Sequence, residues 1–164
     1  MERFLNDNEM GRETGRLLAD RGLSLATAES CTGGTVASMV AAVPGASAYY
    51  RGGVVSYAVS VKEDVLGVTV RDGVVSEDTA LQMARGVARL CKADCAVATT
   101  GVAGPGPSEG KPQGTVCVAA VWGERAVTRT FALKGDREAV ILQSADNALR
   151  LLCQLMAGKE KENR

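Results

Sequence analysis

Short apolar runs along the chain predict a set of strands interleaved with helices. Five runs have the length and composition of strands, at 23–28, 53–59, 95–100, 115–122 and 126–133. The run at 95–100 is continuously apolar, which is typical of a strand buried on both faces. The last two runs flank the turn signal Gly123-Glu124-Arg125 and therefore predict an antiparallel hairpin.

Apolar positions at helical spacing predict helices around these strands. The predicted ranges are 2–21, 33–43, 60–66, 76–92 and 136–156. Gly22 ends the first helix, Pro44 and Gly45 end the second, and Ser76 is a good N-cap for the fourth. Strands interleaved with helices, together with one hairpin, predict an α/β fold: a three-layer α/β/α domain on a mixed sheet of about five strands.

The length and hydrophobic content fit one domain over residues 1–164. With 164 residues of which 46% are hydrophobic, the chain can bury a core of its own. The polar tail at 158–164 is predicted to be disordered. No apolar run approaches the roughly 20 residues of a membrane span. The polar start MERFLNDNEM has no apolar signal region, which predicts a cytoplasmic protein.

The charge balance argues against a protein that binds nucleic acid or a membrane surface. The 19 basic and 19 acidic residues cancel, so no long-range field attracts a polyanion. Aromatic residues make up only 4% of the chain, which leaves few rings on which bases could stack. The expected partner is therefore a small molecule held in a local site. A homo-oligomer is compatible with the sequence.

The absence of histidine restricts the chemistry more than any other compositional feature. It excludes the Ser-His and Cys-His arrangements and histidine-ligated metals, so a general base must be Lys, Tyr, Asp, Glu or Cys. The five cysteines are irregularly spaced, and Cys91 and Cys95 have no second cysteine pair to complete a zinc site. We expect reduced thiols, no metal and no cofactor.

The segment 27–34, TAESCTGG, lies where the first strand meets a helix. Helix N-termini present unpaired N–H groups and the positive end of the helix dipole, so such a turn can hold a phosphate or carboxylate. Ser30, Thr32, Gly33 and Gly34 are the residues expected to bind the ligand. The alternative is a merely capped helix.

A second segment offers a nucleophile and a base. Ser47 lies in a predicted loop between a helix and a strand, where its hydroxyl is accessible. Without histidine, a serine nucleophile needs neutral lysine or tyrosinate as its base, and Lys62 and Tyr57 are the nearest downstream candidates. The alternative is that all three are turn or surface residues.

Two later segments could contribute to the same site. Thr100, Gly101 and Gly104 lie beyond the carboxyl end of the buried strand at 95–100, where ligands of α/β sheets gather. Their loop could supply N–H groups to an amide oxygen. Arg137, near the start of the last helix, could reinforce phosphate binding. The alternatives are a glycine-rich surface turn and a solvated arginine.

Taken together and in this order, these segments resemble the CinA C-terminal family. The resemblance extends from about Leu23 to the last helix and is carried by TAESCTGG, PG-x-S-x-Y leading to GGVVSYAVSVK, GVVSEDTALQMA, TTGVAGPGP, KPQGTV and GDR. It implies a hydrolase that converts nicotinamide mononucleotide and water to nicotinic acid mononucleotide and ammonia.

The resemblance also implies roles for individual residues. Ser47 matches the family's nucleophile and Lys62 its partner base, with Tyr57 nearby. The binding residues are implied to be Ser30, Thr32, Thr100, Gly101, Gly104 and Arg137. The chain departs from the family pattern at Gly106-Pro107-Ser108-Glu109, where the family often has a run of glycines.

Two other interpretations of the sequence stay open. In the first, Ser30 or Cys31 is the nucleophile, because a tight turn from strand to helix resembles a nucleophile elbow, although G-x-S-x-G is absent. In the second, the chain is a catalytically silent module that binds a nucleotide or a protein partner. Ammonia release separates the enzymes from the silent module.

Overall fold

Five strands form one mixed sheet in the order β2-β1-β3-β4-β5. A computed structural model describes residues 7–158. Its strands are β1 (Leu25–Glu29), β2 (Tyr50–Val55), β3 (Cys95–Gly101), β4 (Thr115–Trp122) and β5 (Arg125–Ala132). Its helices are α2 (Glu9–Arg21), α3 (Thr35–Ala41), α4 (Val59–Leu66), α5 (Glu77–Cys91) and α6 (Arg137–Ala157), with a short 3₁₀ helix η1 (Ala46–Ala48).

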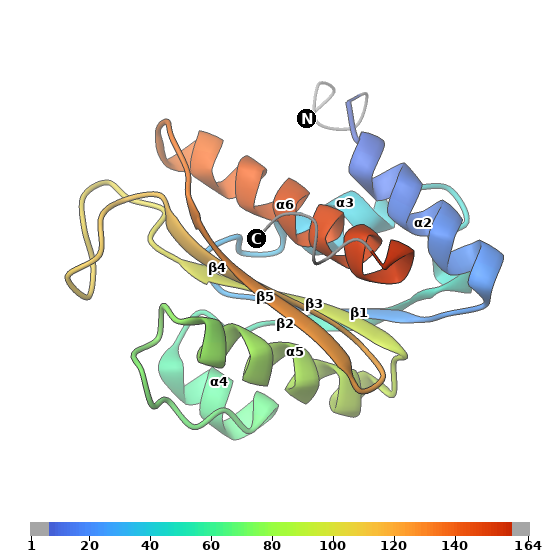
Figure 1. Ribbon diagram of the computed structural model, residues 1–164, viewed down its shortest axis with the longest axis horizontal. Coiled ribbons are helices and arrows are strands. Elements are labelled where there is room, and N and C mark those ends of the chain that lie inside the picture. The colour runs from blue at the N-terminus through green and yellow to red at the C-terminus, as the bar shows by residue number, and fades with distance from the viewer. Residues whose placement is uncertain (1–6, 159–164) are drawn as a thin grey trace.

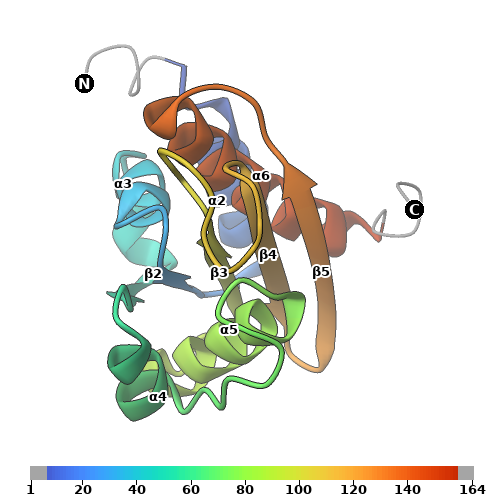
Figure 2. The same ribbon diagram turned by 90° about the vertical axis from the view of Figure 1, so that its left-hand side faces the viewer.

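Helices cover both faces of the sheet, as Figures 1 and 2 show. One face carries α2, α3 and α6, and the other carries α4 and α5. Each face has its own hydrophobic core, because neighbouring residues of a strand point to opposite sides: Leu25 and Val97 join the first core, and Ala26 and Ala98 join the second. The predicted three-layer α/β/α fold is confirmed.

The strand pairing changes from parallel to antiparallel across the sheet. Both β2 and β3 run parallel to β1, whereas β4 is antiparallel to β3 and β5 is antiparallel to β4. The predicted hairpin is therefore confirmed, with Gly123 and Glu124 between its strands. Because parallel strands end at the same edge of a sheet, the segments that follow β1, β2 and β3 lie together.

The second strand lies three to four residues earlier than the sequence predicts. It was expected at 53–59, but β2 starts at Tyr50, whose register partner is Leu25, and it stops at Val55. The last pairing bond joins the N–H of Ser56 to the carbonyl of Glu29, at 2.7 Å. After Ser56 the chain turns away into α4, which therefore begins at Val59.

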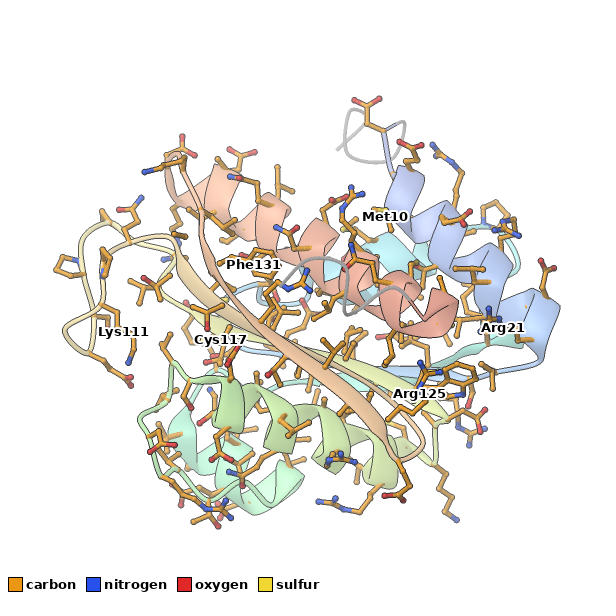
Figure 3. The ribbon with its side chains drawn as sticks, viewed as in Figure 1. Met10, Arg21, Lys111, Cys117, Arg125 and Phe131 are labelled. Carbon is orange, nitrogen blue, oxygen red and sulfur yellow. The ribbon has the colours of Figure 1, made fainter. Side chains whose placement is uncertain are left out.

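The only tryptophan anchors the end of the last helix. The guanidinium groups of Arg21 and Arg125, labelled in Figure 3, lie 5.4 and 5.0 Å from the centre of the Trp122 ring. Arg21 also donates to the carbonyl of Met156 at 2.7 Å, and Arg125 donates to that of Leu155 at 3.1 Å. Cations at the C-terminal carbonyls of a helix are favourable, so this cluster stabilises the last turn of α6.

Two sequence predictions concern regions at the ends of the chain. Of the tail predicted to be disordered, only Gly158 is described, and it ends α6 in the left-handed conformation with φ 71°. The rest of the tail, and residues 1–6 of the first predicted helix, lie outside the described residues. Within the described range, no helix is both long and apolar enough to cross a membrane.

Candidate active site

Residues that follow the three parallel strands form the candidate site. Ser30 comes directly after β1, Ser56 and Tyr57 come after β2, and Thr100 and Gly101 end β3. The N–H of Ser30 donates to the carbonyl of Thr99 at 3.0 Å, which ties the turn after β1 to β3. The sheet therefore brings together polar groups that are far apart in the sequence.

A buried lysine lies at the centre of this group. Lys62, in α4, has an exposed fraction of 0%. Its Nζ lies 2.9 Å from the Oγ of Ser30, and it donates to the carbonyls of Ser56 and Tyr57, the latter at 3.4 Å. Ser30 is 9% exposed, so its hydroxyl lies at the edge of the interior. The structure thus pairs Lys62 with a serine.

This arrangement accommodates both protonation states of Lys62. Burial lowers the pKa of Lys62, and the nearby Cys31 and Glu109 partly oppose that shift. A neutral amine has two N–H donors and one lone pair. The carbonyls of Ser56 and Tyr57 can take the two donors, which leaves the lone pair for the Ser30 hydroxyl proton. The protonated form instead donates to all three oxygens.

Ser47 lies apart from this pair. It is in η1 and is exposed to solvent. Among the described residues, Ser47 makes no side-chain hydrogen bond, to Lys62 or to any other residue. The accessible hydroxyl expected from the sequence is present, but the expected pairing of Ser47 with Lys62 has no hydrogen bond to support it. The open alternative, Ser30, has one.

A buried carboxylate shapes the turn that carries Ser30. Glu29, 1% exposed, accepts from the N–H of Val36 at 2.8 Å and from that of Ala37 at 3.0 Å, both in the first turn of α3. It also accepts from the hydroxyl of Thr32 at 2.6 Å. Glu29 thereby satisfies the unpaired N–H groups of the helix start and fixes the turn between Ser30 and α3.

This carboxylate limits which groups of the TAESCTGG turn could bind a ligand. A phosphate was expected at the start of the helix, but the side chain of Glu29 already takes the N–H groups of Val36 and Ala37 there. The Thr32 hydroxyl is also engaged, with Glu29 and with Thr99 at 2.7 Å. Gly33 and Gly34 have φ of 57° and 109°, the left-handed conformation that the tight turn requires.

We expect Glu29→Gln to destabilise the fold by about 2–4 kcal/mol, because an amide cannot accept all three hydrogen bonds and places N–H donors against N–H groups. The free energy of unfolding in urea measures this loss. Glu124→Gln, in the exposed turn after β4, is the matched control and should change that free energy by less than about 0.5 kcal/mol. A loss at Glu29 as small as that of the control would contradict the capping role.

Tyr57 and Arg137 form the outer part of the site. Tyr57 is 60% exposed, and its hydroxyl accepts from Nη2 of Arg137 at 2.9 Å. Nη1 of Arg137 donates to the carbonyl of Gly104. The predicted residues Tyr57, Gly104 and Arg137 are therefore brought together. Tyr57 reaches Lys62 only through its backbone carbonyl, so its phenol is not hydrogen-bonded to the lysine.

Two other predicted binding residues have structural contacts. The Thr100 hydroxyl donates to the carbonyl of Val74 at 2.9 Å, and Thr100 is buried. A Cβ on Gly101 would lie 2.7 Å from Val116 and 2.8 Å from the carbonyl of Thr115, so only glycine fits there. Thr100 thus supports the edge of the site through its hydrogen bond, and Gly101 through close packing.

Comparison with known proteins identifies the family. The family model described as the CinA C-terminal domain matches residues 7–156. The chain belongs to the CinA C-terminal domain family. A crystal structure of a CinA superfamily protein from Klebsiella pneumoniae is similar, with a TM-score of 0.89, 36% identity, and coverage of 92% of this chain and 98% of that one.

Curated relatives with this domain are longer than the present chain. A putative competence-damage inducible protein of Desulforamulus reducens is 40% identical over 94% of this chain and 38% of its own length. A CinA-like protein of Frankia casuarinae is 45% identical over 87% of this chain and 34% of its own length. The chain thus spans less than two fifths of these relatives, and their names specify no reaction.

Within this CinA domain, the thiol beside Ser30 is poorly suited to be a nucleophile. Cys31 is 6% exposed, and desolvation raises the pKa of its thiol to about 12. A thiol needs to ionise before it attacks, so Cys31 stays unreactive near neutral pH. All five cysteines are free. Across residues 7–158 there is no group of three or more Cys, Asp or Glu side chains that could hold a metal ion.

Sequence reasoning missed the role of Glu29 and the partner of Lys62. A usable signal for Lys62 was its position four residues before Leu66 in α4, because residues at that spacing share one helix face and the face of Leu66 is buried. A lysine on a buried helix face is costly without a polar partner. That spacing does not show which polar group is the partner, and Ser30 lies 32 positions away.

Proposed function

We propose that this chain is an amidohydrolase that converts nicotinamide mononucleotide and water to nicotinic acid mononucleotide and ammonia, with Ser30 as nucleophile and Lys62 as base. The observation that carries the proposal is the fully buried Lys62 with its Nζ 2.9 Å from the Ser30 Oγ. The substrate class comes from the family resemblance, and the pairing of these two side chains supplies the chemistry.

The reaction begins when the Ser30 Oγ attacks the carboxamide carbon and gives its proton to the neutral Lys62 Nζ. When the tetrahedral intermediate collapses, the C–N bond breaks and Lys62 returns the proton to the departing nitrogen, which leaves as ammonia. Water then attacks the Ser30 ester and passes a proton to Lys62. The ester C–O bond breaks, Ser30 regains its proton, and the acid is released.

The turn after Ser30 offers a donor for the oxyanion of this reaction. The N–H of Gly33 donates to the carbonyl of Ser30 at 3.1 Å, which closes a tight turn. Within residues 7–158, the N–H of Thr32 in that turn makes no hydrogen bond, and we assign it to the substrate oxygen. One well-placed oxyanion donor is commonly worth roughly 3 kcal/mol of transition-state stabilisation.

The direct test is to incubate the purified chain with nicotinamide mononucleotide and a chelator and to measure ammonia and nicotinic acid mononucleotide. We expect both products in equal amounts and no effect of the chelator. The Ser30→Ala variant provides the background. If the chain binds the mononucleotide, as measured by a shift in melting temperature, but releases no ammonia, it is a silent binding module instead.

The activity should rise with pH from the acid side. Because burial lowers the pKa of Lys62, the neutral amine that acts as base becomes available at a lower pH than for an exposed lysine. Below that pKa, Lys62 is protonated and cannot accept the Ser30 proton, so kcat/KM falls. A pH profile of kcat/KM measures this limb. A flat profile from pH 5 to 10 would contradict a lysine base.

A further inference from the structure

A second carboxylate ties together two loops beside the site. Glu109 lies in the loop 102–114, whose outer end is marked by Lys111 in Figure 3. Its carboxylate accepts from the N–H of Val74 at 3.1 Å and from that of Val75 at 3.2 Å. These residues precede α5, so Glu109 joins the loop after β3 to the loop after α4.

The segment that Glu109 contacts is itself held in place and leaves room for the carboxylate. Thr100, at the end of β3, holds the carbonyl of Val74, while Glu109 holds its N–H, so Val74 is held through both of its backbone polar groups. Gly73 has φ of 86°, and a Cβ there would lie 2.9 Å from a carboxylate oxygen of Glu109. Only glycine therefore allows the close approach of this carboxylate.

Glu109 itself adopts a conformation that few residues tolerate. Its φ is 52°, and it is one of two non-glycine residues with positive φ in the described part of the chain. The other, Lys92, ends a helix, where this conformation is common. Here Glu109 and Gly110 are the central residues of a tight turn that Ser108 and Lys111 close with two backbone hydrogen bonds of 3.0 and 2.9 Å, and such turns require positive φ. The turn presents the Glu109 carboxylate to the N–H groups of Val74 and Val75.

The rest of the loop is held on the opposite side. Gln113 accepts from the N–H of Gly106 at 3.0 Å and donates to the carbonyl of Gly135 at 3.1 Å. Arg137 donates a hydrogen bond to the carbonyl of Gly104. These contacts tie the loop to the start of α6, whereas Glu109 ties it to the segment before α5. The loop is thus fixed from both helix layers of the fold.

We propose that Glu109 is a positioning residue of the Ser30–Lys62 site: it clamps the loop 102–114 to Val74 and Val75, fixes the rim of the site and places one negative charge near Lys62. This inference rests on the proposed function for its effect on activity. The clamp does not depend on the proposed function, because amide hydrogen exchange measures it without any turnover.

The charge of Glu109 affects the pKa of Lys62 in one direction. Glu109 and Cys31 are the two groups that favour the protonated form of Lys62. Cys31 remains a neutral thiol near neutral pH, because burial raises its pKa. Other charged groups near these residues are Lys111, whose Nζ lies 3.9 Å from the Glu109 carboxylate, Glu29, close to Cys31, and Arg137, beside Tyr57. Removing the Glu109 charge therefore lowers the pKa of Lys62 and moves the acid limb of the activity to lower pH.

The experiment compares Glu109→Gln and Glu109→Ala with the parent chain, and uses Glu124→Gln as a control for loss of one surface carboxylate. Glu124 lies in the turn between β4 and β5, at the opposite end of the sheet from Ser30. Amide hydrogen exchange at Val74 and Val75 reports on the clamp. The pH profile of kcat/KM and the separate values of kcat and KM report on the site.

We expect Glu109→Ala to speed exchange at Val74 and Val75 by roughly tenfold or more, because hydrogen bonds to a charged acceptor are lost. KM should rise severalfold in both Glu109 variants, and the acid limb should move to lower pH in both, with Glu124→Gln unchanged. Unaltered exchange would overturn the clamp. Faster exchange with a superimposable pH profile and KM would overturn the positioning role, and absent activity in the parent chain would reject the proposed function alone.

Discussion

Replacing Ser30 by alanine is expected to lower kcat for ammonia release by at least about 10³-fold, because the hydroxyl next to Lys62 is the proposed nucleophile. Ser47→Ala, the matched control, removes the same atom from an exposed position in η1. It should keep kcat within about threefold of the parent. Surface substitutions rarely change the free energy of unfolding by more than about 0.5 kcal/mol, so the fold that holds the site is kept. Initial rates at saturating nicotinamide mononucleotide measure both.

The reverse outcome would exchange the roles of the two serines. If Ser47→Ala were inactive and Ser30→Ala active, the assignment from the family resemblance would be right and the one from the hydrogen bond wrong. Trapping the acyl-enzyme at low pH and locating the modified peptide provides independent evidence. We expect the acyl group on the peptide that contains Ser30.

Replacing Lys62 by arginine is expected to abolish activity, with a loss of at least about 10³-fold in kcat/KM. A guanidinium preserves the positive charge but does not give up its proton at accessible pH, so it cannot act as the base. The same rate assay measures the loss, and the acid limb of the pH profile should disappear from any residual activity. Near-normal turnover with an unchanged profile would leave Lys62 only an orienting role.

Because Lys62 is fully buried, the larger arginine could also disturb packing. Lys62→Met provides the second variant, since methionine is unbranched and flexible like lysine and has no charge to desolvate. Its stability reflects two opposing effects: the desolvation cost of the lysine is removed, but Ser30, Ser56 and Tyr57 lose a donor. A folded but inactive Lys62→Met separates chemistry from packing.

Much of the fold follows directly from the sequence pattern. The apolar run at 95–100 predicted a central strand, and β3 is buried over Cys95–Thr100 and pairs on both sides. The turn signal at Gly123 predicted the hairpin. The second strand was displaced because its start depends on its register against β1, and a parallel register is set by tertiary contacts that no local pattern contains.

The sequence predicted which residues belong to the site, but not which serine is hydrogen-bonded to Lys62. Sequence proximity favoured Ser47 for Lys62, since only 15 positions separate them and Ser30 is 32 positions away. The pairing of Glu29 with Val55 decides against proximity, because it brings the ends of β1 and β2 to the same edge. The capping role of Glu29 was equally hidden, since the sequence does not show which helix N–H groups a side chain will reach.

The position of Trp122 makes the molecule's own fluorescence a useful reporter. As the only tryptophan, it lies at the end of β4 opposite Ser30, held with Arg21 and Arg125 against the end of α6. Its emission therefore reports whether the strand and the helix termini are still assembled, and substitutions around Lys62 leave its surroundings untouched. An inactive variant with the parent's emission spectrum is thus folded, and its defect lies at the site.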